Sequence, residues 1–178
     1  MKKVLPILLI ALVAVSCASS QKMFQKGQYD RAIDKASEKL MKKPGNDKEL
    51  AVLKEAYELA NTFDQERIDF LQLEGLEESW VEIYMLYEQM NIRQNKVRRL
   101  PSSVRSQFSF VNYDQKIVDS KAAAADVSYR RGEEFLASGD KMSARQAYLE
   151  FEQADAIYPG YRDVVRKMAE AEITGRNN

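Results

Sequence analysis

The sequence predicts an all-α fold assembled from pairs of antiparallel helices. Composition is the first reason: 30% of the 178 residues are charged, with only 7 glycines and 4 prolines, which favours helix over sheet. The second is that apolar residues recur at intervals of three and four along much of the chain, the spacing of an amphipathic helix. The third is Gly139-Asp140, where glycine suits a left-handed helix end and aspartate the N-cap of the next helix.

Two antiparallel helices are therefore predicted on either side of Gly139. Gly132 lies within the first, where glycine costs about 1 kcal/mol relative to alanine, so its bare backbone is expected to admit a close neighbour. Ala144 on the second helix can be that neighbour, and the two small residues would let the helix axes approach within about 8–9 Å. Larger residues are expected to form a buried stripe between the helices: Phe135, Tyr148 and Phe151.

These residues resemble a tetratricopeptide repeat, whose pattern is Gly-x2-Tyr, Ala-x3-Phe and a terminal Pro over about 34 residues. The matching positions are Gly132-x2-Phe135, Gly139, Ala144-x3-Tyr148 and Pro159. Ser128 and Arg131 stand where the pattern prefers Trp and Leu, and Pro159 comes late. The resemblance implies an all-α, short tetratricopeptide-like array of helical hairpins, an α–α superhelix. An ordinary helical hairpin with a Gly-Asp turn is the alternative.

An earlier repeat is predicted near the N-terminus, in truncated form. Gly27, Ala32 and the turn at Pro44-Gly45 look like the second half of such a repeat. Residues 17–26 would then hold only a tether and a shortened first helix. The array is expected to fill residues 27–174, and residues 175–178 are expected to fray.

Further helices follow from capping residues and apolar spacing. Asn46 or Asp47 caps a helix that is expected to break at Asn61-Thr62, with a partner helix over residues 63–73. The other segments predicted to be helical are residues 80–99, 114–137 and 161–173. The last of these resembles the helix that covers the open end of such arrays.

Residues 101–112 are predicted to form an irregular loop inserted in the array. Pro101 ends the preceding helix, while Phe108 and Phe110 alternate with polar residues and hint at a short extended piece. The spacing from Gly27 to Gly139 also exceeds three repeats of about 34 residues by roughly ten. Long loops with aromatic side chains are commonly functional, so Phe108 and Phe110 are candidates for partner binding. The alternative is a loop folded back on its own array.

Residues 1–16 resemble a bacterial lipoprotein signal peptide. Lys2-Lys3 precede an apolar run of about twelve residues, shorter than the ~20 that a membrane-spanning helix needs. The run ends in Ala14-Val15-Ser16-Cys17, small residues before the only cysteine of the chain, as in a lipobox. The resemblance implies cleavage before Cys17 and attachment of fatty acyl chains, such as palmitate, to that residue. An ordinary signal peptide cleaved nearby is the alternative.

The mature chain from Cys17 would carry 25 basic and 27 acidic side chains, a net charge of −2. This balance predicts no net attraction to anionic lipid, so the acyl chains on Cys17 are expected to hold the protein on its membrane. Ala18, rather than aspartate, follows Cys17. In this respect the chain resembles lipoproteins that are sorted to the outer membrane, and the resemblance implies a location on its periplasmic face. In a host with one membrane, the same signal implies the outside of the plasma membrane.

Two clusters of side chains admit two interpretations each. A stripe of apolar and aromatic residues is either core or a peptide-binding groove; its members are Trp80, Ile83, Tyr84, Tyr87 and Met90. A basic cluster is either a solvated helix end or a site for an acidic partner or lipid head group. Its members are Arg93, Lys96, Arg98, Arg99 and Arg105.

The sequence argues against catalysis and against nucleic-acid binding. Histidine is absent, which removes the usual acid/base at neutral pH and the commonest metal ligand. The spacing of residues shows no glycine-rich phosphate loop, nucleophile arrangement or metal-ligand cluster. The 27 basic and 27 acidic residues lack the basic surplus that phosphate binding needs. We therefore predict a non-enzyme without cofactor or metal.

The family resemblance implies a scaffold that binds envelope proteins, or peptide segments of them, on its concave face. The corresponding inner-helix positions are Asp126, Tyr129, Glu133 and Leu136, and in the earlier repeat Lys48, Ala51, Glu55 and Glu58. An accessory subunit of outer-membrane protein assembly is one alternative role, and a peptidoglycan-associated structural lipoprotein is another. The sequence leaves the partner and the oligomeric state open.

Overall fold

The protein is all-helical in the part that its computed structural model describes, residues 19–177. Cys17 and the predicted signal peptide lie outside these residues. Eight helices and no strand are found between residues 19 and 177. The helices are α1 (Ser20–Gln25), α2 (Tyr29–Lys42), α3 (Asp47–Glu74), α4 (Ser79–Arg98), α5 (Ser102–Arg105), α6 (Asp114–Ala137), α7 (Lys141–Ile157) and α8 (Val164–Asn177).

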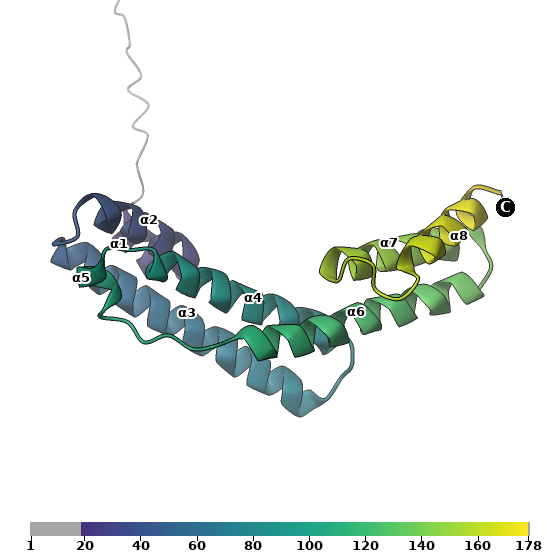
Figure 1. The fold of residues 1–178 in the computed structure, drawn as a ribbon, viewed down its shortest axis with the longest axis horizontal. Helices are drawn as coiled ribbons and strands as arrows, with labels where there is room; N and C mark the ends of the chain where they lie inside the picture. Colours follow the sequence, from purple (N-terminus) through teal and green to yellow (C-terminus); the bar gives the residue numbers. More distant parts are fainter. Residues whose placement is uncertain (1–18, 178) are drawn as a thin grey trace, which may run out of the picture.

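The helices form an elongated molecule with two groups joined by α6 (Figure 1). Helices α1 to α5 make up one group, in which α2 packs on α3 and α3 on α4. Helices α7 and α8 make up the other and pack on each other. Helix α6 belongs to both groups, because it packs against α4 as well as against α7.

Capping residues set several helix ends where the sequence predicts them. The side chain of Asn46 accepts a hydrogen bond from the backbone N–H of Glu49 at the start of α3. Asp140 does the same for Met142 and Ser143 at the start of α7. Gly139 has φ of 72°, a left-handed conformation that glycine adopts without steric cost. The predicted helix end at Gly139 and the predicted helix start at Asp140 are therefore confirmed.

Four adjoining apolar clusters run along the molecule. The first joins α1, α2, the first half of α3 and the end of α4, with Ile33, Leu40 and Leu53 fully buried. The second joins the second half of α3 to α4 through Ile68, Ile83 and Tyr87. The third, around Ala124 and Ala125, joins α4 to α6, and the fourth holds α6, α7 and α8 around Phe151.

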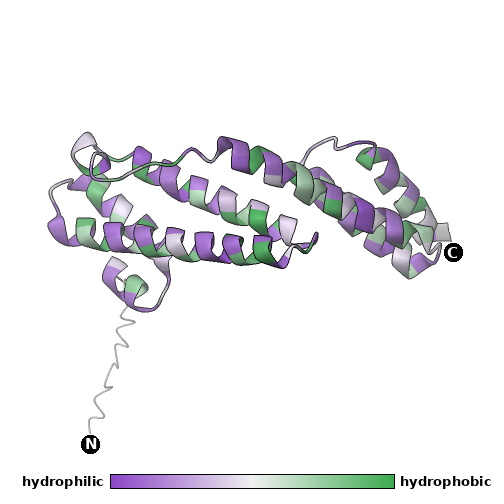
Figure 2. Ribbon diagram, turned by 90° about the horizontal axis from the view of Figure 1, so that it is seen from below, coloured by the Kyte–Doolittle hydropathy of each residue, from purple (hydrophilic) through white to green (hydrophobic). Residues whose placement is uncertain are grey.

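Each helix contributes one side to these clusters and leaves the other to solvent. Figure 2 accordingly shows hydrophobic and hydrophilic residues alternating along the helices. Of the aromatic stripe on α4, Ile83, Tyr87 and Met90 are buried, and Trp80 packs against the same clusters. The stripe is thus core. None of the described helices is both long enough and apolar enough to cross a membrane.

The predicted break at Asn61-Thr62 is wrong, because α3 is one continuous helix of 28 residues. Neither glycine nor proline interrupts this helix, and the side chain of Asn61 accepts a hydrogen bond of 2.6 Å from Arg93 Nη1. The Asn61 side chain therefore bonds to Arg93 on α4 and does not compete for the backbone hydrogen bonds of α3. Residues 63–73, predicted to be a separate partner helix, are the second half of α3.

The predicted close neighbour of Gly132 is also wrong. A β-carbon at Gly132 would lie 2.7–2.9 Å from ring carbons of Phe151, so the glycine admits an aromatic ring from α7. Ala144 instead faces α8, where a β-carbon at Gly175 would lie 3.9 Å from that of Ala144. Gly175 is buried in α8, which continues to Asn177. The C-terminal residues predicted to fray are therefore helical as far as 177.

The predicted loop over residues 101–112 contains the short helix α5 and lies against helix α4. The side-chain amide of Gln94 is buried and bonds both backbone groups of Val111, accepting from N–H at 2.7 Å and donating to the carbonyl at 2.8 Å. The extended piece expected near Phe108 and Phe110 pairs with no strand among the described residues.

Candidate functional site

The inner-helix face predicted from the repeat resemblance is covered by the chain's own C-terminal segment. Tyr129 is buried, and its hydroxyl donates to the carboxylate of Asp163. Tyr161 donates a hydrogen bond of 2.8 Å to Asp126, and Lys167 lies 3.5 Å from Glu133. Three of the four predicted residues on α6 are thus bound to residues 161–167.

Arg162 stabilises the contact between residues 161–167 and α6, although its own backbone conformation is unfavourable. Its φ is 48°, which is uncommon for a residue other than glycine and costs of order 1–3 kcal/mol. The guanidinium lies 5.1 Å from the ring centre of Tyr129 and 5.2 Å from that of Tyr161. It also contacts Asp126 at 2.7 Å. These contacts offset the strain and hold the start of α8 on α6.

Leu136, the fourth predicted residue of this face, is half-buried and packs on the same apolar cluster as Phe151. Asp126, Tyr129, Glu133 and Leu136 therefore stabilise the fold in this structure. Sequence periodicity correctly placed them on one face. It gave no indication that residues 161–167 would occupy that face.

Acid is expected to weaken this contact. The hydrogen bond from Tyr129 and the nearby Arg166 guanidinium lower the pKa of Asp163 below its ordinary value. Because the folded carboxyl binds its proton less tightly than the unfolded one, its contribution is present above the unfolded pKa of about 4 and is lost as pH falls through the lower folded pKa. Urea unfolding at several pH values should show a smaller acid-induced loss of stability for Asp163→Asn than for wild type. Equal losses in both proteins would contradict this assignment.

The loop residues Phe108 and Phe110 are half-buried rather than free. The Phe108 ring meets Tyr57 edge-on with centres 5.4 Å apart, and the Arg98 guanidinium lies 5.1 Å from the centre of Phe110. Lys54 Nζ also donates a hydrogen bond of 2.7 Å to Gln107 in the loop. The loop thus follows the second of the two predicted possibilities, because it folds back on helices α3 and α4.

The predicted binding positions on α3 are open to solvent, in contrast to the covered positions on α6. Lys48, Ala51, Glu55 and Glu58 are all exposed along α3. Glu58 borders a hollow of about 470 Å³ between α3 and the loop, together with Tyr57 and Phe108. This stripe is accessible, but only Glu58 among its members borders that hollow.

Arg93, which the sequence placed in a basic helix end, is buried with 2% of its side chain exposed. It contacts Asp30 of α2 at 2.8 Å, Asn61 of α3 at 2.6 Å and Asp64 of α3 at 2.8 Å. A buried guanidinium requires such partners. Arg93 is therefore a structural link between three helices, and the solvated interpretation is wrong for this residue.

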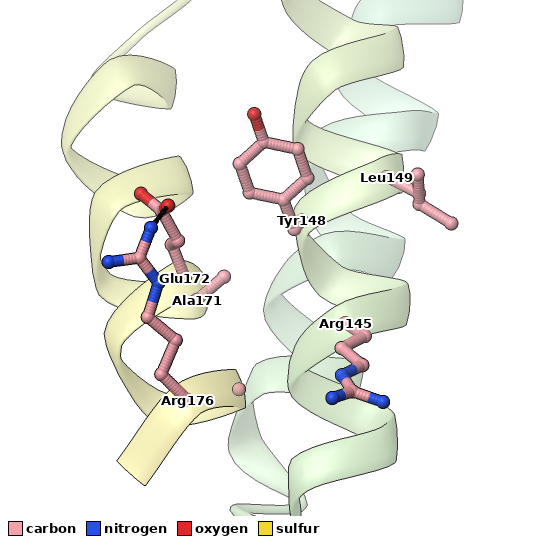
Figure 3. Close-up of a pocket in the computed structure, with 7 residues that line it drawn as sticks. Arg145, Tyr148, Leu149, Ala171, Glu172 and Arg176 are labelled. Carbon is pink, nitrogen blue, oxygen red and sulfur yellow. Dashed lines mark hydrogen bonds and ion pairs between the residues drawn. The ribbon is translucent and has the colours of Figure 1, made fainter.

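A groove lined by apolar and charged side chains lies between α7 and α8 at the C-terminal end of the molecule. Its volume is about 390 Å³. Tyr148 stands between the two helices, and Glu172 and Arg176 on α8 pair with each other (Figure 3). The lining residues are Arg145, Tyr148, Leu149, Ala171, Glu172, Gly175 and Arg176. Small residues on α8 form its floor, since Ala171 and Gly175 are both buried.

Two groups on α7 make this groove suited to a ligand. Leu149 leaves 53% of its surface exposed, although it lies at the edge of an apolar groove. Arg145 has no carboxylate within ion-pair distance anywhere between residues 19 and 177; its guanidinium reaches only the sulfur of Met142 at 4.0 Å. The apolar periodicity of the sequence gave no indication of this groove. The exposed residues Met142, Arg145 and Leu149, spaced three and four apart, are the signal that could have indicated it.

Comparison with protein-family models, curated proteins and solved structures finds no match for this chain. Among the described side chains, no group of three or more carboxylates or cysteines could hold a metal ion.

Proposed function

We propose that this protein is a lipid-anchored, non-catalytic scaffold that binds another protein of the cell envelope. The lipobox-like segment ending at Cys17 supports the anchor and a periplasm-facing location. The helical hairpins and the Gly132 to Pro159 pattern support a tetratricopeptide-like array. The observation that carries the binding role is the open groove between α7 and α8.

The occupant we propose is an amphipathic helix of the partner protein that carries an acidic residue on its apolar side. A row of apolar side chains on such a helix would cover Tyr148 and Leu149, as in other helix-in-groove complexes. The acidic residue would face Arg145, whose charge lacks a partner among the described residues. Charge complementarity at the rim would then orient the helix along the groove.

Site-specific photocrosslinking in envelopes tests this function. A crosslinking residue at position 149 should react with one partner, within a segment of helical apolar spacing that includes Asp or Glu. The matched control is position 146 on the same helix, because Gln146 is exposed but does not line the groove. Arg145→Glu should lower the yield at position 149 by about tenfold, since like charges would then face each other.

A charge swap distinguishes specific pairing with Arg145 from nonspecific crosslinking of a nearby protein. Replacing the partner's acidic residue with arginine should restore crosslinking to the Arg145→Glu protein. Equal yields at positions 146 and 149, or no effect of Arg145→Glu, would show that the groove does not hold such a helix.

A further inference from the structure

Charge is distributed unevenly along the N-terminal group of helices. Residues 19–48 and 93–113 together contain thirteen lysines and arginines and four acidic residues. Residues 49–92 between them contain two basic and eleven acidic residues. The overall charge of −2 for the mature chain thus hides two opposite regions of similar size.

The fold gathers the basic segments at one end of the molecule. Helices α2 and α4 both finish there, α3 begins there, and α5 follows α4 (Figure 1). Met41 and Arg99 border the same hollow between α2 and α4, and Arg105 Nη1 donates to the backbone carbonyl of Arg98 at 3.4 Å. We call the exposed cations at this place the basic end: Lys42, Lys43, Lys48, Arg98, Arg99 and Arg105.

These six cations lack ionic partners within residues 19–177. None of them has a carboxylate within 4.0 Å among residues 19–177, whereas the neighbouring Lys39 and Lys96 are paired with Glu49 and Asp34. Three nearby carboxylates, Asp34, Glu38 and Glu49, are thereby already paired with other lysines, and Asp47 is the exposed acidic residue beside Lys48. The basic end therefore presents several unneutralised charges to whatever lies beside it.

The chain also enters the fold at this end. Ser20 at the start of α1 donates a hydrogen bond to Glu49, and Lys39 Nζ lies 3.4 Å from the Ser20 hydroxyl. In the sequence, Cys17 precedes Ser19, the first described residue, by two residues. If Cys17 carries the lipid of the proposed function, the bilayer surface must lie close to the basic end.

We propose that the basic end binds anionic phospholipid head groups and sets the orientation of the protein on its membrane. This inference rests on the proposed anchor for its location, and on the unpaired cations for its chemistry. Each cation near an anionic surface strengthens membrane partitioning by about fivefold. Because the basic end lies at one end of the long axis, the α7–α8 groove would project away from the bilayer (Figure 1).

Vesicle binding of the whole mature chain tests the charge contribution without its lipid. The chain from position 17, with Cys17→Ser, should partition into phosphatidylcholine vesicles containing phosphatidylglycerol far better than into pure phosphatidylcholine. Replacing Lys42, Lys43 and Arg99 with glutamine should weaken the anionic partitioning by about a hundredfold, as three cations are lost. The matched control replaces Lys116, Lys121 and Lys141, which changes the net charge equally but leaves the basic end intact.

Orientation gives a second readout. A dye at Gly45→Cys, beside the basic end, should be quenched by brominated anionic lipid, whereas a dye at Ser138→Cys, in the α6–α7 turn, should not. Equal partitioning into both kinds of vesicle, or equal losses in the two triple variants, would overturn the inference. Metabolic fatty-acid labelling of the native chain tests the anchor separately. If labelling is negative but the chain still binds vesicles with anionic lipid, the anchor on Cys17 is rejected and head-group binding by the basic end is retained.

Discussion

Replacing Arg93 with methionine is expected to lower the free energy of unfolding by about 3–5 kcal/mol. The substitution keeps most of the apolar stem but leaves the carboxylates of Asp30 and Asp64 without their shared guanidinium. Three helices lose a common polar link, because the two aspartates belong to α2 and α3 while Arg93 belongs to α4. Urea unfolding followed by circular dichroism at neutral pH measures the loss.

Removing one carboxylate at a time provides the control. Asp64 is the more buried of the two, with 20% of its side chain exposed against 43% for Asp30. Adding Asp64→Asn to Arg93→Met should recover part of the lost stability, since an unpaired buried charge is then removed. If the double variant is less stable than Arg93→Met, the stabilising role assigned to this ion pair is wrong.

Acidic solution should narrow the difference between wild type and Arg93→Met. Burial raises the pKa of Asp64 even in the presence of Arg93, whose hydrogen bond and charge act in the opposite direction. Without the guanidinium, this pKa rises further in the folded state. A carboxyl with a raised folded pKa stabilises the fold at low pH, and this contribution is lost as pH rises through that pKa. The penalty of the variant should therefore be smallest in acid.

The second large effect concerns Gly132→Ala, which is expected to lower stability in the wild-type protein and to raise it when the Phe151 ring is removed. In the wild-type protein, Gly132→Ala should destabilise by about 1–2 kcal/mol, because overpacking costs about 1–3 kcal/mol and the better helix propensity of alanine returns up to about 1. The new β-carbon would lie 2.7–2.9 Å from carbons of the Phe151 ring. That ring is fully buried and meets Tyr129 with centres 5.5 Å apart, so it has little room to move.

Truncating the ring should reverse the effect of the same substitution. Phe151→Ala alone is expected to cost about 3–5 kcal/mol. In that background Gly132→Ala should stabilise by about 0.5–1 kcal/mol, since only the helix propensity and a filled space remain. Gly175→Ala is the control, because its nearest atom is 3.4 Å away on the flexible Arg145 side chain. An unchanged sign at Gly132 would disprove the ring contact.

Helix ends with a local chemical signal could be predicted from the sequence. Asn46, Asp140 and Gly139 each act within a few residues of the chain, so their capping roles hold in the structure. The break at Asn61-Thr62 could not be judged in this way. Whether Asn61 ends a helix depends on Arg93, which is distant in sequence and meets it only after α3 and α4 pack.

The candidate site shows the same division between local and tertiary information. Periodicity placed Asp126, Tyr129 and Glu133 on one face, but it could not show that Tyr161, Arg162 and Lys167 would bind there. The α7–α8 groove arises from the packing of two helices whose small residues, such as Ala171, read as ordinary core positions. The basic end likewise depends on three helix termini meeting in space.

Helix α6 has a mechanical consequence because it is shared by both helix groups. Its 24 residues rise about 1.5 Å each, and successive side chains turn by about 100°. The separation between the two ends of the protein is thus fixed by a rigid rod rather than by a flexible linker. Lengthening or shortening that rod by a single residue would swing the groove around the long axis, so reach and facing direction are coupled in this molecule.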